Sequence, residues 1–462
     1  MHLCAWGDAS KNLVRRFDMQ TAVDEIHYVG ERSRALNWII CDANFGILER
    51  DIELARHIRQ VRDAHGYPKT CHVWLAKNVT ERNLEIGKIL GDMVVPVMAV
   101  QSLDDEVLRN IKQSNISTET YVQYQRQFHR IGSTTYSDLI VPLPGETLKS
   151  HVAGLSKLFS HGVDEIACHN MRLLAGAEAN SDETRETFGF RTRYRLIHGD
   201  AGIYGREVRA EIRSFEYEDP LRSTTSMTEE QMFYLRKLHV LVDCMWNSRL
   251  YRPLLRALAL YGVNQVDVLR ALLAVADGSS PVDIEADARA DVRRFFAAFE
   301  QASRSEWFDS AEEIEVYFAR PENFQRLLDQ EFEKLNIQYS VVLLNRFKPS
   351  FDRVIADLCR SFDTVPHDVL EPVCAYAFAQ FPGLDATGTE RALFIPDNLD
   401  RLNDRTVGDF APSTSLRRIT FVEDERRAEL RRLIVEARGR TLSRDPQHAA
   451  HHARLTTTEA VA

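Results

Sequence analysis

The stretch Ser137-Asp138-Leu139-Ile140-Val141, followed directly by Pro142-Leu143-Pro144-Gly145-Glu146-Thr147, decides the fold class of this chain. The apolar run predicts a buried strand, Pro144-Gly145 predicts a turn, and Thr147 is suited to begin a helix that we expect to reach about His161. A second apolar run, from Val163 to Cys168, follows that helix. A strand, a helix and a further strand are the repeating unit of parallel sheets, so this stretch predicts an α/β fold.

The same alternation continues toward the N-terminus. Further strands are expected at residues 37–42, 72–77 and 94–101. Helices are expected at 19–32, 49–65 and 104–113, with another beginning at Thr80. Strands with two apolar faces are typical of a parallel sheet covered by helices, either open or closed into a barrel.

Beyond about Thr228 the strand pattern gives way to helical periodicity. Helices are expected at 229–246, 254–260, 266–276, 290–302, 311–318, 324–335, 350–361, 367–378 and 424–438, with one late strand at 416–422. We therefore expect an α/β core at 1–227, a mostly α-helical C-terminal domain at 228–440 and a flexible tail at 441–462. His448, His451 and His452 lie in that tail, and we interpret them as solvated side chains and not as metal ligands.

Composition narrows the functional class. The 462 residues are 44% hydrophobic and 27% charged, which is typical of a globular protein with a large core. A net charge of −10 argues against a general nucleic-acid binder, and we expect no nucleic-acid partner. Seven cysteines without paired spacing fit a reducing cytoplasm. We found no signal sequence and no apolar stretch of membrane-spanning length, so we expect no membrane association.

Polar residues follow the expected strands where active sites of parallel sheets form, at the carboxyl ends of the strands. The loops read Asp42-Ala43-Asn44-Phe45-Gly46, Lys77-Asn78, Gln101-Ser102 and Pro142 to Thr147. A purely structural interpretation stays open, because Asp and Asn are common caps and Pro-Gly is a common turn.

Three of these loops, together with Met1-His2-Leu3-Cys4-Ala5-Trp6-Gly7, carry a family resemblance. In this order they resemble the radical S-adenosylmethionine (SAM) superfamily, specifically the group whose members have a cobalamin-binding domain before the core. The family pattern has a D-x-N-F-G loop, a Q-S-L-D loop and an L-P-G-E-T loop. The matches are Asp42 to Gly46, Gln101 to Asp104 and Leu143 to Thr147, and the resemblance covers about residues 1–230.

The resemblance implies a partial (β/α) barrel of the radical SAM type, related to the TIM barrel, and it implies three cofactors. Cys4 corresponds to a ligand of a [4Fe-4S] cluster, whose open iron binds SAM and whose electron cleaves it. Cobalamin is implied for the full-length protein. A reductant such as flavodoxin or ferredoxin would supply the electron, and the substrate would be a small molecule or peptide. The implied reaction is modification of an unactivated carbon, by methylation or rearrangement.

The resemblance also assigns binding residues. Asn44 would face the methionine part of SAM, and Gln101 and Ser102 its amino-acid end or ribose. Ile140 to Pro142 would pack near the adenine, although the family usually has a small residue where this chain has Pro142. Trp6 would cover the cluster or nucleotide edge, or else fill the bottom of the barrel. No residue is assigned as a radical relay or a substrate base.

The cluster motif is incomplete, because the second cysteine position falls on Met1 and the first would precede it. We expect a fragment of a longer enzyme that is inactive by itself; a cluster-free relative and a cluster completed by a partner chain are alternatives. Two other functions also stay open. One is a catalytically silent barrel acting as a binding or scaffold module, and the other is a conventional α/β enzyme that uses Asp42 and Lys77.

Overall fold

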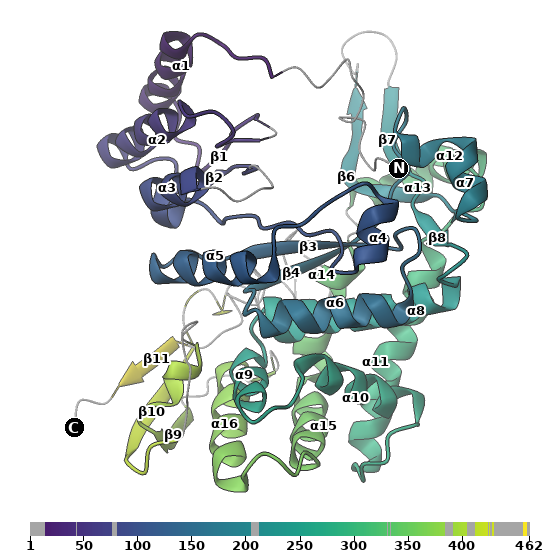
Figure 1. Ribbon diagram of the computed structural model, residues 1–462. Coiled ribbons are helices and arrows are strands. Elements are labelled where there is room, and N and C mark those ends of the chain that lie inside the picture. The colour runs from purple at the N-terminus through teal and green to yellow at the C-terminus, as the bar shows by residue number, and fades with distance from the viewer. Residues whose placement is uncertain are drawn as a thin grey trace. The chain divides into compact units, whose positions relative to one another are not determined.

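A computed structural model describes residues 14–42, 44–75, 81–204, 212–329, 331–332, 334–383, 391–403, 412–423, 425, 427–428 and 456–459. It is a mixed structure of helices and strands. The chain divides into two compact units (Figure 1). Unit 1 comprises 1–169 and 174–185, and unit 2 comprises 170–173 and 186–462. The domain boundary expected at residue 227 stays a prediction.

Unit 1 begins with two parallel strands and three helices, which lie together in Figure 1. In chain order they are α1 (Met19–Arg32), β1 (Asn37–Ile39), α2 (Asp51–His65), β2 (Thr70–His72) and α3 (Glu81–Leu90). Asp18 caps α1 by accepting hydrogen bonds from the N–H groups of Gln20 and Thr21. A single parallel bridge joins Phe45 to Leu75 beyond the two strands. Apolar side chains of α2, α3 and both strands form one buried cluster.

The rest of unit 1 is built around β3 (Tyr136–Val141) and β4 (Glu165–Asn170), which pair with each other. The helical segments here are η3 (Gly91–Met93), α4 (Asp105–Asn110), α5 (Thr118–Arg130), α6 (Leu148–Ser160), η4 (Glu178–Asn180) and α7 (Asp182–Thr187). The expected strand at 94–101 contributes only two parallel bridges to β3, at Val97 and Gln101. A buried carboxylate fixes α5 to this sheet, because Asp164 Oδ2 accepts from Thr135 N (3.0 Å) and contacts His129 Nε2 (2.9 Å).

The segments around β3 have one covered and one open face. Burial alternates along β3, where Ser137, Leu139 and Val141 are buried and the residues between them are partly exposed. The same alternation runs from Val97 to Ser102. Because successive side chains of an extended segment point to opposite faces, one face carries the core and the other carries Gln101, Asp138 and Ile140.

Unit 2 starts with two antiparallel pairs, β6 (Arg195–Tyr204) with β7 (Ile212–Glu218) and β5 (Arg191–Thr192) with β8 (Leu221–Ser223). The β6–β7 pair was not expected from the sequence. Phe215 and Tyr217 of β7 pack with Phe318 and Phe324 in a separate apolar cluster. The pair therefore has its own hydrophobic support.

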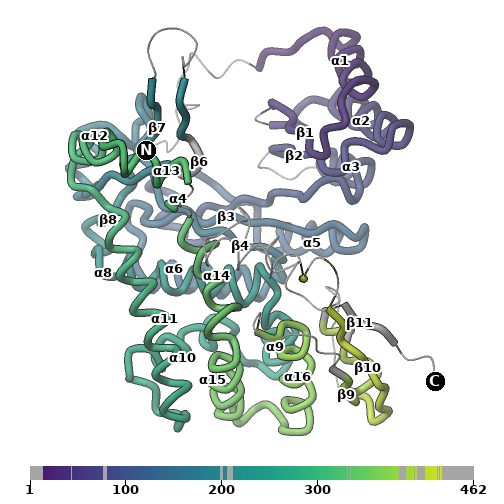
Figure 2. The backbone as a smooth tube through the Cα atoms, turned by 180° about the vertical axis from the view of Figure 1, so that it is seen from behind, coloured from purple at the N-terminus to yellow at the C-terminus, as the bar shows by residue number. Residues whose placement is uncertain are grey.

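The remainder of unit 2 is mainly helical, and Figure 2 shows α10, α11, α15 and α16 side by side. The helices are α8 (Glu229–Leu241), η5 (Val242–Asn247), α9 (Arg252–Leu260), α10 (Gln265–Asp277), α11 (Ala286–Ser305), α12 (Ala311–Ala319), α13 (Pro321–Leu328), α14 (Leu335–Val342), η6 (Leu343–Phe347), α15 (Lys348–Arg360), α16 (His367–Gln380) and η7 (Leu399–Asn403). Strands β9 (Arg391–Pro396), β10 (Leu416–Val422) and β11 (Thr456–Glu459) form an antiparallel sheet in the order β11-β10-β9. The helical character expected for residues 229–378 is confirmed, as is the strand at 416–422. The helix expected at 424–438 lies almost wholly outside the described residues, and His448, His451 and His452 lie outside them too.

No single helix in the described part of the chain is both long enough and apolar enough to span a membrane. Among the described helices, only α9 and α10 taken together have that length and apolarity, and this pair is bent by 119°.

Candidate functional site

The loop after β1 is shaped by its own polar residues. Asn44 N donates to Asp42 Oδ1 (2.8 Å), and Ile47 N donates to the carbonyl oxygen of Asn44 (3.0 Å). These bonds use the Asp42 side chain and the Asn44 backbone to make the turn. The Asn44 side chain is exposed, so it lies where a ligand can reach it.

Gly46 and Asp51 fix the next part of this loop. Gly46 has φ +96°, and a Cβ atom at this position would clash with Asn83 Oδ1. Asp51 Oδ2 accepts from Gly46 N (2.9 Å) and Leu48 N (3.0 Å). Burial raises the pKa of the Asp51 carboxyl above its ordinary value, although the two backbone donors act in the opposite direction. The buried Asp51 carboxylate therefore holds the loop, and the close approach of Asn83 requires a glycine at position 46.

Gln101 and Ser102 form the second loop, at the edge of β3. Gln101 has φ +54°, a conformation that costs energy for a residue with a side chain. Its N–H donates to the carbonyl oxygen of Asp138 (3.1 Å), and its carbonyl oxygen accepts from Ile140 N (2.9 Å). Ser102 is buried, and its Oγ accepts from Asp104 N (3.2 Å). Gln101 is thus left half-exposed at the strand end, whereas the Ser102 hydroxyl supports the loop.

The third loop, Pro142 to Thr147, is held in place by hydrogen bonds from Asn110 and within the loop itself. Asn110 Nδ2 donates to the carbonyl oxygen of Pro144 (2.9 Å). Glu146 is 2% exposed; its Oε2 accepts from Leu143 N (3.1 Å), and its Oε1 accepts from His151 Nδ1 (3.2 Å). The acid of the L-P-G-E-T motif therefore holds the loop closed and is not presented to a ligand.

A polar group on the open face of β3 and β4 was missed in the sequence analysis. His169 Nε2 lies 3.0 Å from Asp138 Oδ1 and 3.2 Å from Tyr136 Oη. Burial and the nearby Asp138 carboxylate raise the pKa of the Tyr136 phenol well above its ordinary value. The available signal was Asp138 itself, because a charged residue inside an apolar strand is rarely placed without a partner.

The predicted residues fall into separate groups. Gln101, Ser102 and Ile140 are brought together at β3, and Pro142 is buried directly after that strand. Asn44 belongs instead to the β1–β2 pair. Cys4 and Trp6 lie outside the described residues, as does Lys77.

The described cysteines differ in their exposure to solvent. Among the described residues, no three cysteines lie close enough to share a metal. Cys71 is buried, and burial raises the pKa of its thiol to about 12, which opposes the thiolate that a cluster requires. Cys41 is exposed after β1.

Fold and loops together define a mixed α/β protein whose polar loops follow parallel strands, with a helical second unit. No family model matches the chain. It is 35% identical over 193 residues to 2-(S-pantetheinyl)-carbapenam-3-carboxylate methyltransferase of Streptantibioticus cattleyicolor. It is 33% identical over 193 residues to the cobalamin-dependent radical SAM methyltransferase TokK of Streptomyces tokunonensis. Over this stretch the chain is thus similar to a cobalamin-dependent radical SAM methyltransferase, the group that the loops resemble.

The extent of this similarity is limited. Each match covers 41% of this chain and 28% of the relative, so the chain spans about a quarter of the length of these methyltransferases. Two solved structures of the radical SAM methyltransferase TsrM from Kitasatospora setae are also similar, at 15% and 17% identity. They cover 38% and 40% of this chain, and 34% and 36% of TsrM, each with a TM-score of 0.32.

Proposed function

We propose that this chain carries core elements of a cobalamin-dependent radical SAM methyltransferase, and that the intact enzyme methylates an unactivated carbon. The observation that carries the proposal is the 33% and 35% identity over 193 residues to two methyltransferases. The three strand-end loops support it, because each is held in a defined shape by hydrogen bonds of its own. This similarity does not favour a catalytically silent scaffold.

The residues of this chain that we assign to SAM lie near the ends of strands or in the loops that follow them. Asn44 is exposed in the loop after β1 and contacts the methionine part, while the half-exposed Gln101 contacts its amino-acid end or ribose. The buried Ser102 acts indirectly, by supporting the Gln101 loop. The half-buried Ile140 and the buried Pro142 offer apolar surface to the adenine. A zwitterionic ligand with a flat base requires this mixture of amide groups and apolar surface.

The cofactors and the barrel belong to the same proposal. TsrM is described with cobalamin and a [4Fe-4S] cluster, and with tryptophan and a SAM analogue. By analogy, we assign a cluster, SAM and cobalamin to the intact enzyme, with Cys4 as a cluster ligand. We further propose that β1 to β4 are part of a (β/α) barrel, that the enzyme is cytoplasmic, and that flavodoxin or ferredoxin reduces it. The substrate is a small molecule or peptide.

Binding of SAM tests the assigned residues without requiring turnover. We expect N44A to weaken SAM binding about tenfold in equilibrium dialysis, because the variant loses amide hydrogen bonds to a charged ligand. Asn37 is a matched control, since it is also exposed but lies at the other end of β1. N37A should bind as the wild type does. Equal affinities for N44A and N37A would remove Asn44 from the site.

Cluster assembly tests the class of enzyme. The chain is reconstituted anaerobically with iron, sulfide and cobalamin, beside an extended version in which Met1 is replaced by cysteine and the first cysteine of the motif is added upstream. Iron, acid-labile sulfide and 5′-deoxyadenosine are then measured. We expect about four irons per chain and SAM cleavage in the extended version only. If neither version binds iron, the proposed function is wrong.

A further inference from the structure

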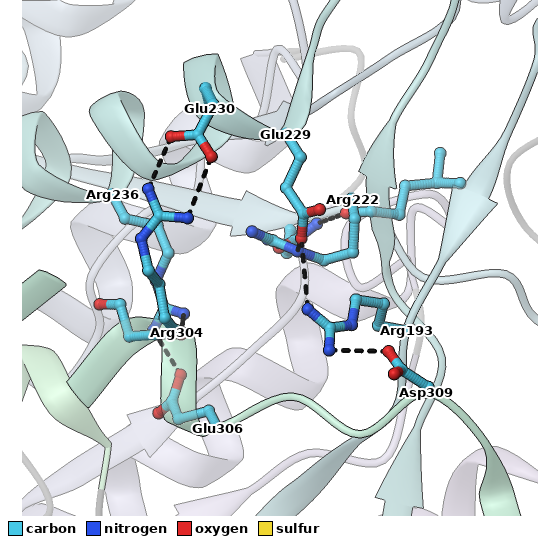
Figure 3. A network of polar contacts seen from close by, with 11 residues as sticks. Arg193, Arg222, Glu229, Glu230, Arg236, Arg304, Glu306 and Asp309 are labelled. Carbon is cyan, nitrogen blue, oxygen red and sulfur yellow. Dashed lines mark hydrogen bonds and ion pairs between the residues drawn. The ribbon is translucent and has the colours of Figure 1, made fainter. Parts of the chain in front are cut away.

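A buried arginine in unit 2 has a donor that no protein group satisfies. Arg222, on β8, is 1% exposed, and its Nε donates to Glu229 Oε1 (3.2 Å). Its Nη1 donates to Asn170 Oδ1 at 3.4 Å, the long end of the hydrogen-bond range. Its Nη2 has no hydrogen-bond partner among the described residues. Figure 3 shows this guanidinium beside Glu229 and Arg193.

Two further unsatisfied donors belong to the same group of side chains. Trp307 lies against Arg222, whose guanidinium carbon is 4.0 Å from the centre of the indole ring. The Trp307 Nε1 and the Arg193 Nε are also buried atoms without a hydrogen-bond partner in the described part of the chain. Arg193 is connected to this group through Glu229, which its Nη1 approaches to 3.8 Å. Buried donors without acceptors are rare and costly, so three in one group indicate a missing acceptor.

The charges of this group favour an anion. Five arginines of the group form ion pairs with only four acidic residues. The arginines are Arg172, Arg193, Arg195, Arg222 and Arg236, and the acids are Glu218, Glu229, Glu306 and Asp309. Burial, followed by the charge of Arg236, lowers the pKa of Arg222 to about 10. The group thus has one positive charge more than its acidic residues balance.

Arg304, in the same unit, has a guanidinium whose Nε, Nη1 and Nη2 all form hydrogen bonds with carboxylates, in contrast to Arg222. Its Nη1 and Nη2 donate to the two carboxylate oxygens of Glu230 (3.0 and 2.6 Å), and its Nε donates to Glu300 (3.1 Å). These acids raise the pKa of Arg304 above its ordinary value. Figure 3 shows the two arrangements in one view. The unsatisfied donors are therefore a property of the Arg222 group and not of every arginine here.

We propose that Arg222 Nη2, Trp307 Nε1 and Arg193 Nε bind a small oxyanion, either the carboxylate of an organic ligand or an inorganic anion such as sulfate. An oxyanion is an acceptor with negative charge, which matches three donors and an excess guanidinium. Arg193 and Glu229 are about one-third exposed and form the side open to solvent. The proposal rests on unit 2 alone and is independent of the radical SAM function.

Unfolding at constant ionic strength tests this site. The free energy of unfolding is measured in urea while sodium chloride is replaced stepwise by sodium acetate or by sodium sulfate. A ligand bound only by the folded state stabilises it as its concentration rises above its dissociation constant. Acetate and sulfate distinguish a carboxylate ligand from an inorganic one. General salting-out by sulfate acts on all variants alike.

The decisive variant is W307F, which keeps an aromatic ring under the arginines but loses the indole donor. W246F is a matched control, because the Trp246 ring also lies beneath two guanidiniums, those of Arg252 (5.1 Å) and Arg256 (5.6 Å). We expect W307F to weaken anion binding about fivefold, the loss of one hydrogen bond, and W246F to leave it unchanged. R193Q, at the exposed side, should also weaken binding.

Each outcome decides the proposal. An anion-specific stabilisation that falls in W307F and R193Q but not in W246F supports it, and the more effective anion identifies the ligand class. Identical responses of the wild type and R193Q to all anions would overturn it, even if W307F does not fold. A stabilisation by sulfate that is the same in every variant would also overturn it.

Discussion

Gly145 shows at the scale of one residue how the third loop depends on its sequence. Its φ of +81° is in the region that favours glycine, and a Cβ atom there would lie 2.6 Å from Asn110 Nδ2. That same Asn110 amide donates to Pro144 and holds the loop. A side chain at Gly145 therefore strains the backbone and displaces the anchor together.

We expect G145A to lower the free energy of unfolding more than G132A does. Gly132 has a similar φ, +78°, but no atom within 4 Å of an added Cβ. G132A should cost roughly 1–2 kcal/mol for the backbone alone, and G145A about 1–3 kcal/mol more for the clash. Urea unfolding of both variants measures the difference. Equal losses would show that Asn110 moves aside without cost.

Residue-scale features of the site were only partly predictable. The polar loop residues were visible because Asn44, Gln101 and Glu146 follow apolar runs. Their roles were not visible, because Glu146 is turned inward by Leu143 N and His151, which depends on the folded loop. Likewise, the positive φ of Gln101 follows from its two backbone bonds to β3.

At the scale of elements, prediction succeeded where local signals agreed. The helix expected at 19–32 is confirmed as α1, since Asp18 caps it and its periodicity is clear. The strand expected at 72–77 was wrong in its bounds, because pairing of Asn37 with Thr70 starts β2 earlier. Helix α5 was missed because its sequence, Thr118–Arg130, is mostly polar and only Tyr121, Gln125 and Phe128 are buried.

Helix α2 carries a pH-dependent prediction at its first residue. Burial raises the folded-state pKa of Asp51 above the ordinary value of 3.8, so the folded chain keeps this proton after the unfolded chain has released it. The stability contributed by Asp51 is therefore full below pH 3.8 and is lost as the pH rises through the folded-state pKa. The D51N variant keeps an acceptor for Gly46 N and Leu48 N but carries no proton that can be lost. We therefore expect its free energy of unfolding to increase relative to that of the wild type as the pH rises through the folded-state pKa of Asp51.

Urea unfolding between pH 3 and 7 measures this difference. D63N is the control on the same helix, because the Asp63 side chain is 57% exposed. Its stability relative to the wild type should change much less with pH. A difference between D51N and the wild type that stays constant with pH would contradict the assignment.

At the scale of the whole molecule, net charge makes a prediction about partners. With a net charge of −10, the chain should repel a polyanion, and we expect no shift of duplex DNA in gel electrophoresis at 0.1 M salt. A basic protein of similar size is the positive control. Retardation of the DNA that weakens as salt is added would show a local basic surface and contradict this expectation.

The division into units also bears on how the polypeptide is made. Unit 1 is not one continuous stretch, since it needs residues 174–185, and Lys112 Nζ pairs with Glu178 Oε1 at 2.8 Å. At translation rates of about 5–20 residues per second, the ribosome takes roughly 3–13 s to advance from Lys112 to Glu178. Until then the nascent chain lacks the partner of Lys112. Slow codons placed far enough downstream for residues 174–185 to have left the ribosome would therefore give the first unit time to fold before the helical unit emerges.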